Sequence, residues 1–152
     1  MKELSVFPGA RKVLEMLDEH QISYAILTNG HPSIQEPKVV SSGILDWECC
    51  KNIPVFYGYE GDSSVPKPHP KIFHDACKHF DAAHTATVMV GDTMETDILG
   101  AKNANLGFAI YLQRDANRYD TIDGDVTTKV LHAFSHDHMS ELINTLLQQK
   151  MD

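Results

Sequence analysis

Apolar residues form short continuous runs that alternate with longer segments in which they recur every three or four positions. Such runs are typical of buried strands, and the longer spacing is typical of helices with one face on a core. The predicted strands are 23–27, 53–59, 88–90, 108–112 and 129–134. The predicted helices are 8–17, 33–40 (interrupted by Pro37), 70–80, a segment after Gly91, and 135–147. Alternating strands and helices predict a layered α/β domain with a mainly parallel sheet.

The stretch 86–107 holds the strongest candidate chemistry. Its strand, 88–90, has the continuous apolar character of a strand buried on both faces. Asp92 and Asp97 follow Gly91, at the carboxyl end of this strand and in the first turns of the next helix. Carboxylates at that place are suited to hold Mg²⁺ together with substrate oxygens. The alternative is structural, with Asp92 as a helix cap and Asp97 complementing the helix dipole.

Two further segments bring polar groups to the ends of predicted elements. Thr28, Asn29 and Gly30 follow the predicted strand 23–27, although such a turn is also an ordinary way to leave a strand. Lys67 stands between two prolines, which keep it out of helix or strand. It either projects into a site or is a solvated surface lysine.

Composition limits the partners. The 152 residues carry a formal charge of -8, which argues against nucleic acid but allows a small phosphorylated metabolite. Cys49, Cys50 and Cys77 do not form an obvious disulfide framework and indicate reduced thiols in the cytosol. The chain shows neither a secretory leader nor an apolar run near ~18 residues, so we expect a cytoplasmic protein without a membrane segment. The histidines near the carboxyl terminus have no familiar zinc spacing; they are His132, His136 and His138.

Three segments taken together resemble the haloacid dehalogenase-like (HAD) phosphatases: ILTNG at 26–30, VPKPHPKIF at 65–73 and VMVGDTMETDILGAKNA at 88–104. The resemblance covers roughly 7–147 and is greatest to members with an early helical cap, the phosphoglycolate phosphatase-like and N-acylneuraminate-9-phosphatase-like enzymes. It implies a three-layer, Rossmann-like core.

The resemblance also implies roles for the candidate residues. Thr28 and Asn29 would hydrogen-bond the phosphoryl oxygens, and Lys67 would neutralise charge on the phosphoryl group and the nucleophile. Asp92 would ligate Mg²⁺, and Asp97 would support the metal or its waters. Thr28, Lys67 and Asp97 are thus the predicted catalytic residues. Such a set supplies the positioning and charge stabilisation that phosphoryl transfer requires.

The chain departs from the family at its beginning. Family members open with a strand ending in Asp-x-Asp, whose first Asp is the nucleophile, and nothing similar precedes Phe7. Only Asp123-Gly-Asp125 matches as a string, and its lead-in is polar. We therefore expect 1–152 to be a single but incomplete HAD-like core domain, without the first strand or the cap. An absent central strand would leave a gap of about 10 Å and a reason to dimerise.

Three functions are left open. The first is a Mg²⁺-dependent phosphatase core for a small phosphorylated metabolite, inactive until its nucleophile strand is supplied. The second is a non-catalytic module that binds phosphate and metal. The third is a phosphoacceptor receiver domain, but this sequence lacks the acidic cluster that such a domain carries in its first loop.

Overall fold

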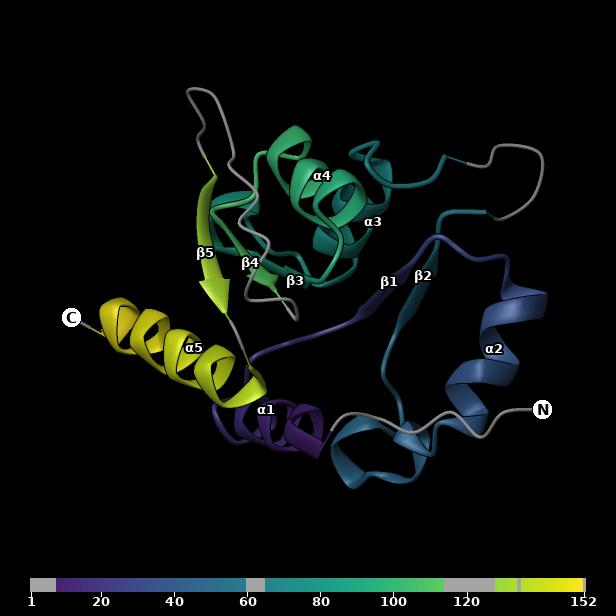
Figure 1. Cartoon of the computed structure of the whole chain (residues 1–152), viewed down its shortest axis with the longest axis horizontal. Helices are drawn as coiled ribbons and strands as arrows, with labels where there is room; N and C mark the ends of the chain where they lie inside the picture. Colours follow the sequence, from purple (N-terminus) through teal and green to yellow (C-terminus); the bar gives the residue numbers. More distant parts are fainter. Residues whose placement is uncertain (1–7, 60–64, 114–127, 134, 152) are drawn as a thin grey trace. The chain divides into compact units, whose positions relative to one another are not determined.

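The computed structural model describes residues 8–59, 65–113, 128–133 and 135–151. The chain divides into two compact units, Met1–Lys67 and Pro68–Asp152, and each is described by itself. Figure 1 labels the elements of both. The expectation of a single domain stays a prediction.

The first unit contains a pair of short parallel strands and its helices. Strand β1 pairs with β2 in the register Ile26↔Val55 to Thr28↔Tyr57. Both strands are half-buried along their length. The predicted strands are therefore present but shorter than their apolar runs. The elements are α1 Pro8–Glu19, β1 Ile26–Thr28, α2 Pro32–Ser41, the 3₁₀ helices η1 Ile44–Asp46 and η2 Glu48–Cys50, and β2 Val55–Tyr57.

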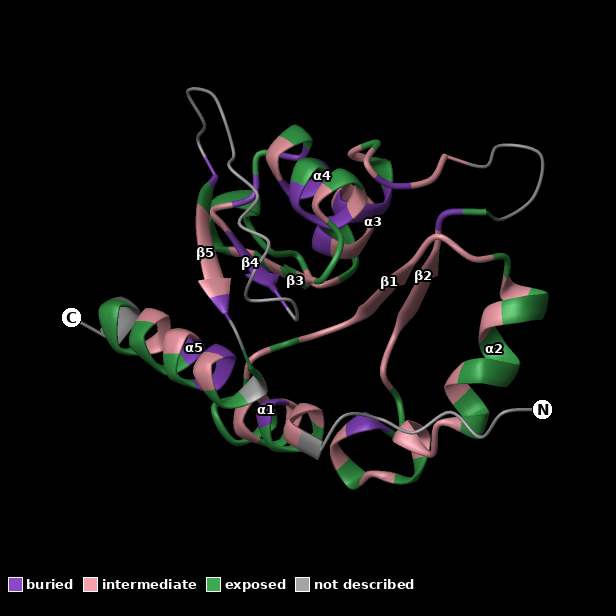
Figure 2. Cartoon of the chain, in the orientation of Figure 1, coloured by how far each residue is buried: buried purple, intermediate pink, exposed green. Residues whose placement is uncertain are grey.

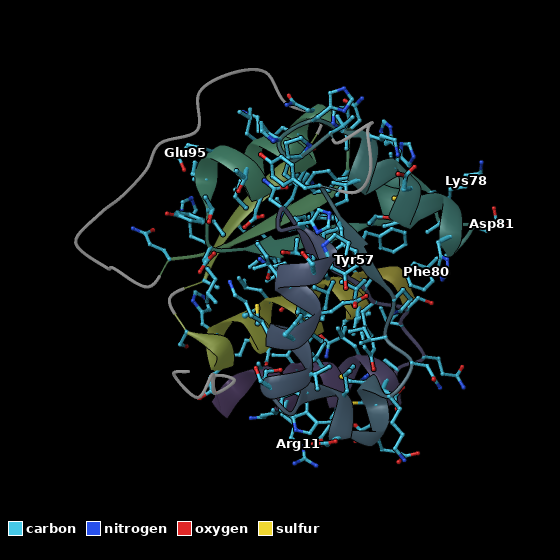
Figure 3. The ribbon with its side chains drawn as sticks, turned by 90° about the vertical axis from the view of Figure 1, so that its right-hand side faces the viewer. Arg11, Tyr57, Lys78, Phe80, Asp81 and Glu95 are labelled. Carbon is cyan, nitrogen blue, oxygen red and sulfur yellow. The ribbon has the colours of Figure 1, made fainter. Side chains whose placement is uncertain are left out.

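The second unit is a three-stranded parallel sheet in the order β3-β4-β5. Helices α3 and α4 lie on one face of this sheet and α5 on the other (Figures 1 and 3), which gives the unit three layers. The elements are α3 Lys71–His79, the 3₁₀ helix η4 His84–Ala86, β3 Val88–Gly91, the π-helix η5 Met94–Ile98, α4 Leu99–Asn103, β4 Phe108–Leu112, β5 Lys129–Ala133 and α5 His136–Met151.

The hydrophobic core of this unit is centred on β4. Ala109 and Ile110 are fully buried between the helix layers, as are Ile98 and Ala101 from the segment that follows β3. Figure 2 shows the concentration of buried residues along β4, α3 and α4. The α/β class with parallel strand pairing is as the sequence predicts.

Strand β3 differs from its prediction. We expected burial on both faces, but Val88 and Val90 are 38% and 36% exposed. The expectation was wrong because β3 ends the order of strands in the described part of the unit, while α5 packs on β4 and β5. No helix within the described residues is both long and apolar enough to cross a bilayer.

Candidate functional site

A side-chain clamp holds Lys67 against the end of β1. The Asn29 side-chain amide makes two hydrogen bonds with the Lys67 backbone, donating from Nδ2 to the carbonyl oxygen at 3.0 Å and accepting from the amide nitrogen at 2.7 Å. These groups are 38 positions apart in the chain. The Asn29 amide thus substitutes for a neighbouring strand and fixes the loop that carries Lys67.

The ammonium group of Lys67 is buried at the carboxyl end of β1. Its Nζ donates to the carbonyl oxygen of Leu27 at 3.0 Å, and the residue is only 9% exposed. Thr28 is the next residue, and its hydroxyl accepts from the Gly30 amide at 3.4 Å. Lys67 is therefore not a solvated surface lysine. A cation held in this way is placed to attract an anion, because its charge is shielded less than in water.

Gly58, the residue after β2, lies so close to Asn29 that this position requires glycine. Its amide donates to the Thr28 carbonyl at 2.7 Å, and a Cβ here would lie 2.7 Å from Asn29 Oδ1 and 2.9 Å from Pro66 Cα. Those distances are too short for a carbon atom. The absence of a side chain at Gly58 thus allows the Asn29 side chain to reach the loop that carries Lys67.

We expect Gly58→Ala to lower the free energy of unfolding by about 1 to 3 kcal/mol, because the added methyl displaces Asn29. Urea denaturation measures the loss. The matched control is Gly43→Asn, since a Cβ on Gly43 would make only an ordinary contact, 3.9 Å from Asp46 Oδ2, and asparagine tolerates its φ of +75°. If both variants lost equal stability, the close approach at Gly58 would not be the cause.

The acidic segment of the second unit has its own local geometry. Thr93 contacts both predicted metal ligands: its hydroxyl donates to Asp92 Oδ1 at 3.2 Å and its backbone amide donates to Asp97 Oδ2 at 3.3 Å. Asp92 is exposed, whereas Asp97 is 7% exposed. Asp97 lies over Gly91, where a Cβ would overlap its side chain. The two carboxylates are thus held on either side of one threonine.

The π-helix η5 carries Asp97 into this position. The Asp97 and Ile98 amides both donate to the Thr93 carbonyl oxygen, at 2.9 and 3.4 Å. The sequence predicted an ordinary helix after Gly91 and gave no role to Thr93. Such wider turns are common at functional sites. The sequence feature that could have pointed to the role of Thr93 is its place directly after Asp92.

These donors fit the requirements of Mg²⁺. The ion prefers oxygen ligands and is commonly bound by one or two carboxylates, with waters and substrate completing its shell. Asp92 would contact the ion, and Asp97, held by the Thr93 amide, would position it or its waters. No group of three or more His, Cys, Asp or Glu side chains suited to a metal occurs among the described residues, so a fully protein-ligated site is not formed there.

The structure therefore groups the predicted residues in two sets. Thr28, Asn29 and Lys67 are brought together in the first unit, and Asp92 and Asp97 in the second. That the two sets share one site stays a prediction, as does phosphoryl contact by Asn29. The Asp123-Gly-Asp125 string lies outside the described residues.

Comparison with known proteins identifies the family to which this α/β chain belongs. Residues 1–105 match the family of haloacid dehalogenase-like hydrolases. The chain belongs to that family, which confirms the resemblance carried by the three segments.

Solved structures share the fold. An HAD phosphatase from Thermococcus onnurineus superposes with a TM-score of 0.72 and 24% identity, over 91% of this chain and 58% of that one. An uncharacterized protein from Listeria monocytogenes serotype 4b gives a TM-score of 0.71 and 22% identity, over 97% and 84%.

Sequence relatives are phosphatases by name. The glyceraldehyde 3-phosphate phosphatase of Pyrococcus abyssi is 40% identical over 99 residues, which are 65% of this chain and 39% of the relative. The human N-acylneuraminate-9-phosphatase is 31% identical over 108 residues, or 70% and 41%. The chain thus spans about two fifths of the length of these curated relatives.

Proposed function

We propose that the chain is the core of a Mg²⁺-dependent phosphatase that acts on a small phosphorylated metabolite. The observation that carries the proposal is the buried Lys67, whose backbone is held by the Asn29 amide and whose ammonium group donates to the Leu27 carbonyl, one residue before Thr28. The names of the relatives support it, since they denote phosphatases of small phosphorylated molecules.

The proposed mechanism gives each group one task. The Thr28 hydroxyl donates to a phosphoryl oxygen, and Lys67 offsets the negative charge that gathers as the phosphoryl group moves. Asn29 is a positioning residue, because its amide holds the Lys67 backbone. Asp92 and Asp97 would hold the Mg²⁺ ion, which when bound would neutralise phosphate charge. Fixed charges of this kind lower the barrier without reorganisation during the reaction.

The nucleophile is the part that the described residues do not supply. The only Asp-x-Asp string in the sequence is Asp123-Gly-Asp125, outside those residues. In the proposed reaction the first carboxylate of an Asp-x-Asp strand attacks phosphorus, and the ester alkoxide leaves with a proton from the second carboxyl group of that strand. Water then gives a proton back to the second carboxylate and hydrolyses the acyl phosphate. We therefore propose that turnover needs an Asp-x-Asp strand and that the 152 residues alone bind without hydrolysing.

Mg²⁺ binding by the 152-residue chain is the first test. Calorimetry should show saturable binding, and Asp92→Asn should weaken it by about tenfold or more, since a charged oxygen ligand is lost. The matched control is Asp75→Asn, which changes an aspartate that pairs with Lys71 at the surface. Equal affinities of the Asp92 and Asp75 variants, or the absence of binding, would contradict the metal assignment.

Phosphate release is the second test. A strand ending in Asp-x-Asp and a cap, added to the chain, should give release from small phosphomonoesters. Binding of Mg²⁺ and phosphate without release from this longer protein would favour the alternative, a non-catalytic binding module.

A further inference from the structure

Two adjacent cysteines bring their sulfur atoms together in the first unit. Cys49 and Cys50 close the 3₁₀ helix η2, and their Sγ atoms are 3.5 Å apart. Cys50 is completely buried, whereas Cys49 is half-buried. Consecutive side chains usually point in different directions, whereas here the two sulfur atoms lie within reach of each other.

The surrounding groups fix the pair in place. The Tyr24 hydroxyl donates to the Cys49 carbonyl, the Cys50 amide donates to the Trp47 carbonyl at 2.9 Å, and the Ile53 amide donates to the Cys50 carbonyl at 3.2 Å. Burial, together with the hydrogen bond to Cys49, raises the pKa of the Cys50 thiol to about 12. The pKa of Tyr24 is also raised, mainly by burial and to a smaller extent by the nearby Cys49 and Cys50 charges. The more exposed Cys49 is therefore the thiol that an external reagent meets first.

We propose that Cys49 and Cys50 form a redox-active vicinal dithiol, which a small-molecule disulfide such as oxidised glutathione converts to an intramolecular disulfide. The Cys49 thiolate attacks the reagent, releases one glutathione thiol and forms a mixed disulfide. The Cys50 thiol then attacks Cys49 Sγ and passes its proton to the departing glutathione sulfur, which releases the second glutathione. Two cysteine thiols are oxidised, and one glutathione disulfide is reduced to two thiols.

The geometry accounts for both steps. The second step needs no access from solvent, so the burial of Cys50 does not prevent it, and the neighbouring sulfur acts at a high effective concentration. Closing the bond brings the sulfurs from 3.5 Å to about 2.05 Å. Adjacent Cα atoms are about 3.8 Å apart, below the usual disulfide range of about 4.4 to 6.8 Å. The bond is therefore strained and readily reduced, as expected of a reversible modification rather than a structural crosslink.

Cys77 provides an internal control. It is 3% exposed, and its Sγ lies 3.6 Å from the Thr87 hydroxyl. It belongs to the second unit, whereas the pair belongs to the first. Selective oxidation of the pair therefore leaves one thiol of the three.

Incubation of the reduced 152-residue chain with oxidised glutathione tests the proposal. We expect titratable thiols in denaturant to fall from three to one, and the intact mass to fall by two hydrogen atoms with no glutathione retained. The tryptic peptide ending at Lys51 should contain the new bond. Emission from Trp47, the single tryptophan, should change on oxidation and recover with reductant.

Two variants separate the pair from general thiol oxidation. Cys77→Ser should close as fast as the parent chain, while Cys50→Ala should stop at the Cys49 mixed disulfide. Retained glutathione on the parent chain, crosslinking of two chains through Cys49, oxidation of Cys77 at the same rate, or no reaction would each overturn the proposal.

Discussion

Replacing Lys67 with methionine is expected to slow phosphate release at least about 100-fold in the chain completed by an Asp-x-Asp strand. Methionine keeps the length and apolar stem of the side chain but removes the charge. Lys67 is only 9% exposed, and its ammonium group donates to the Leu27 carbonyl oxygen at 3.0 Å, so solvent screens its charge weakly. The loss should appear in kcat, because the phosphoryl group gains charge at the transition state.

The matched control for this variant is Lys71→Met. Lys71 is four positions along the chain, and its ion pair with Asp75 is at the surface, with side chains 53% and 45% exposed. Such a pair contributes about 0 to 1 kcal/mol to stability, so this variant should keep nearly full activity. Orthophosphate binding by the 152-residue chain gives an independent readout, in which Lys67→Met should raise Kd about tenfold or more. Similar kinetics in both variants would remove Lys67 from the site.

The sequence predicts the burial of a strand well where a continuous apolar run is covered on both faces of the sheet. Strand β4 has a continuous apolar run, 108–112, and is the buried centre of its sheet. The run 88–90 is equally apolar, yet β3 is partly exposed because its place in the strand order is set by pairing with distant segments. Local pattern gives the type of an element, whereas tertiary neighbours decide its burial.

Candidate residues are predictable from the sequence, but their connections are not. The family resemblance implies that Asn29 contacts a phosphoryl group, which stays a prediction, and it gives no sign that the Asn29 amide bonds to the backbone of a loop 38 positions away. Side-chain to backbone contacts at that separation leave no periodic signal. The same applies to Thr93, whose contacts with two carboxylates depend on the wider turn of η5.

Phe73→Ala should cost about 3 to 5 kcal/mol of unfolding free energy, the largest stability effect that we expect of one substitution. Phe73 is 2% exposed on α3, and its ring lies over Gly100 of α4. Since folded domains have about 5 to 15 kcal/mol of stability, the variant should be close to unfolding. Urea denaturation at constant m-value measures the change.

Phe80→Ala is the control at the other end of α3. Figure 3 shows Phe80 with Lys78 and Asp81 at this end, and the residue is only half-buried. Its ring meets His79 edge-on at 4.9 Å. We expect a smaller cost of about 1 to 2 kcal/mol. An equal cost would show that α3 depends on total aromatic area rather than on its contact with α4.

A double-mutant cycle tests the contact between Phe73 and Gly100 itself. A Cβ on Gly100 would lie 2.5 Å from Phe73 Cε2 and Cζ, so Gly100→Ala should destabilise the parent chain by about 1 to 3 kcal/mol. In the Phe73→Ala background the same methyl enters the space left by the ring, and its cost should largely disappear. The interaction free energy should then exceed about 1 kcal/mol, whereas additive costs would mean that the ring does not rest on Gly100.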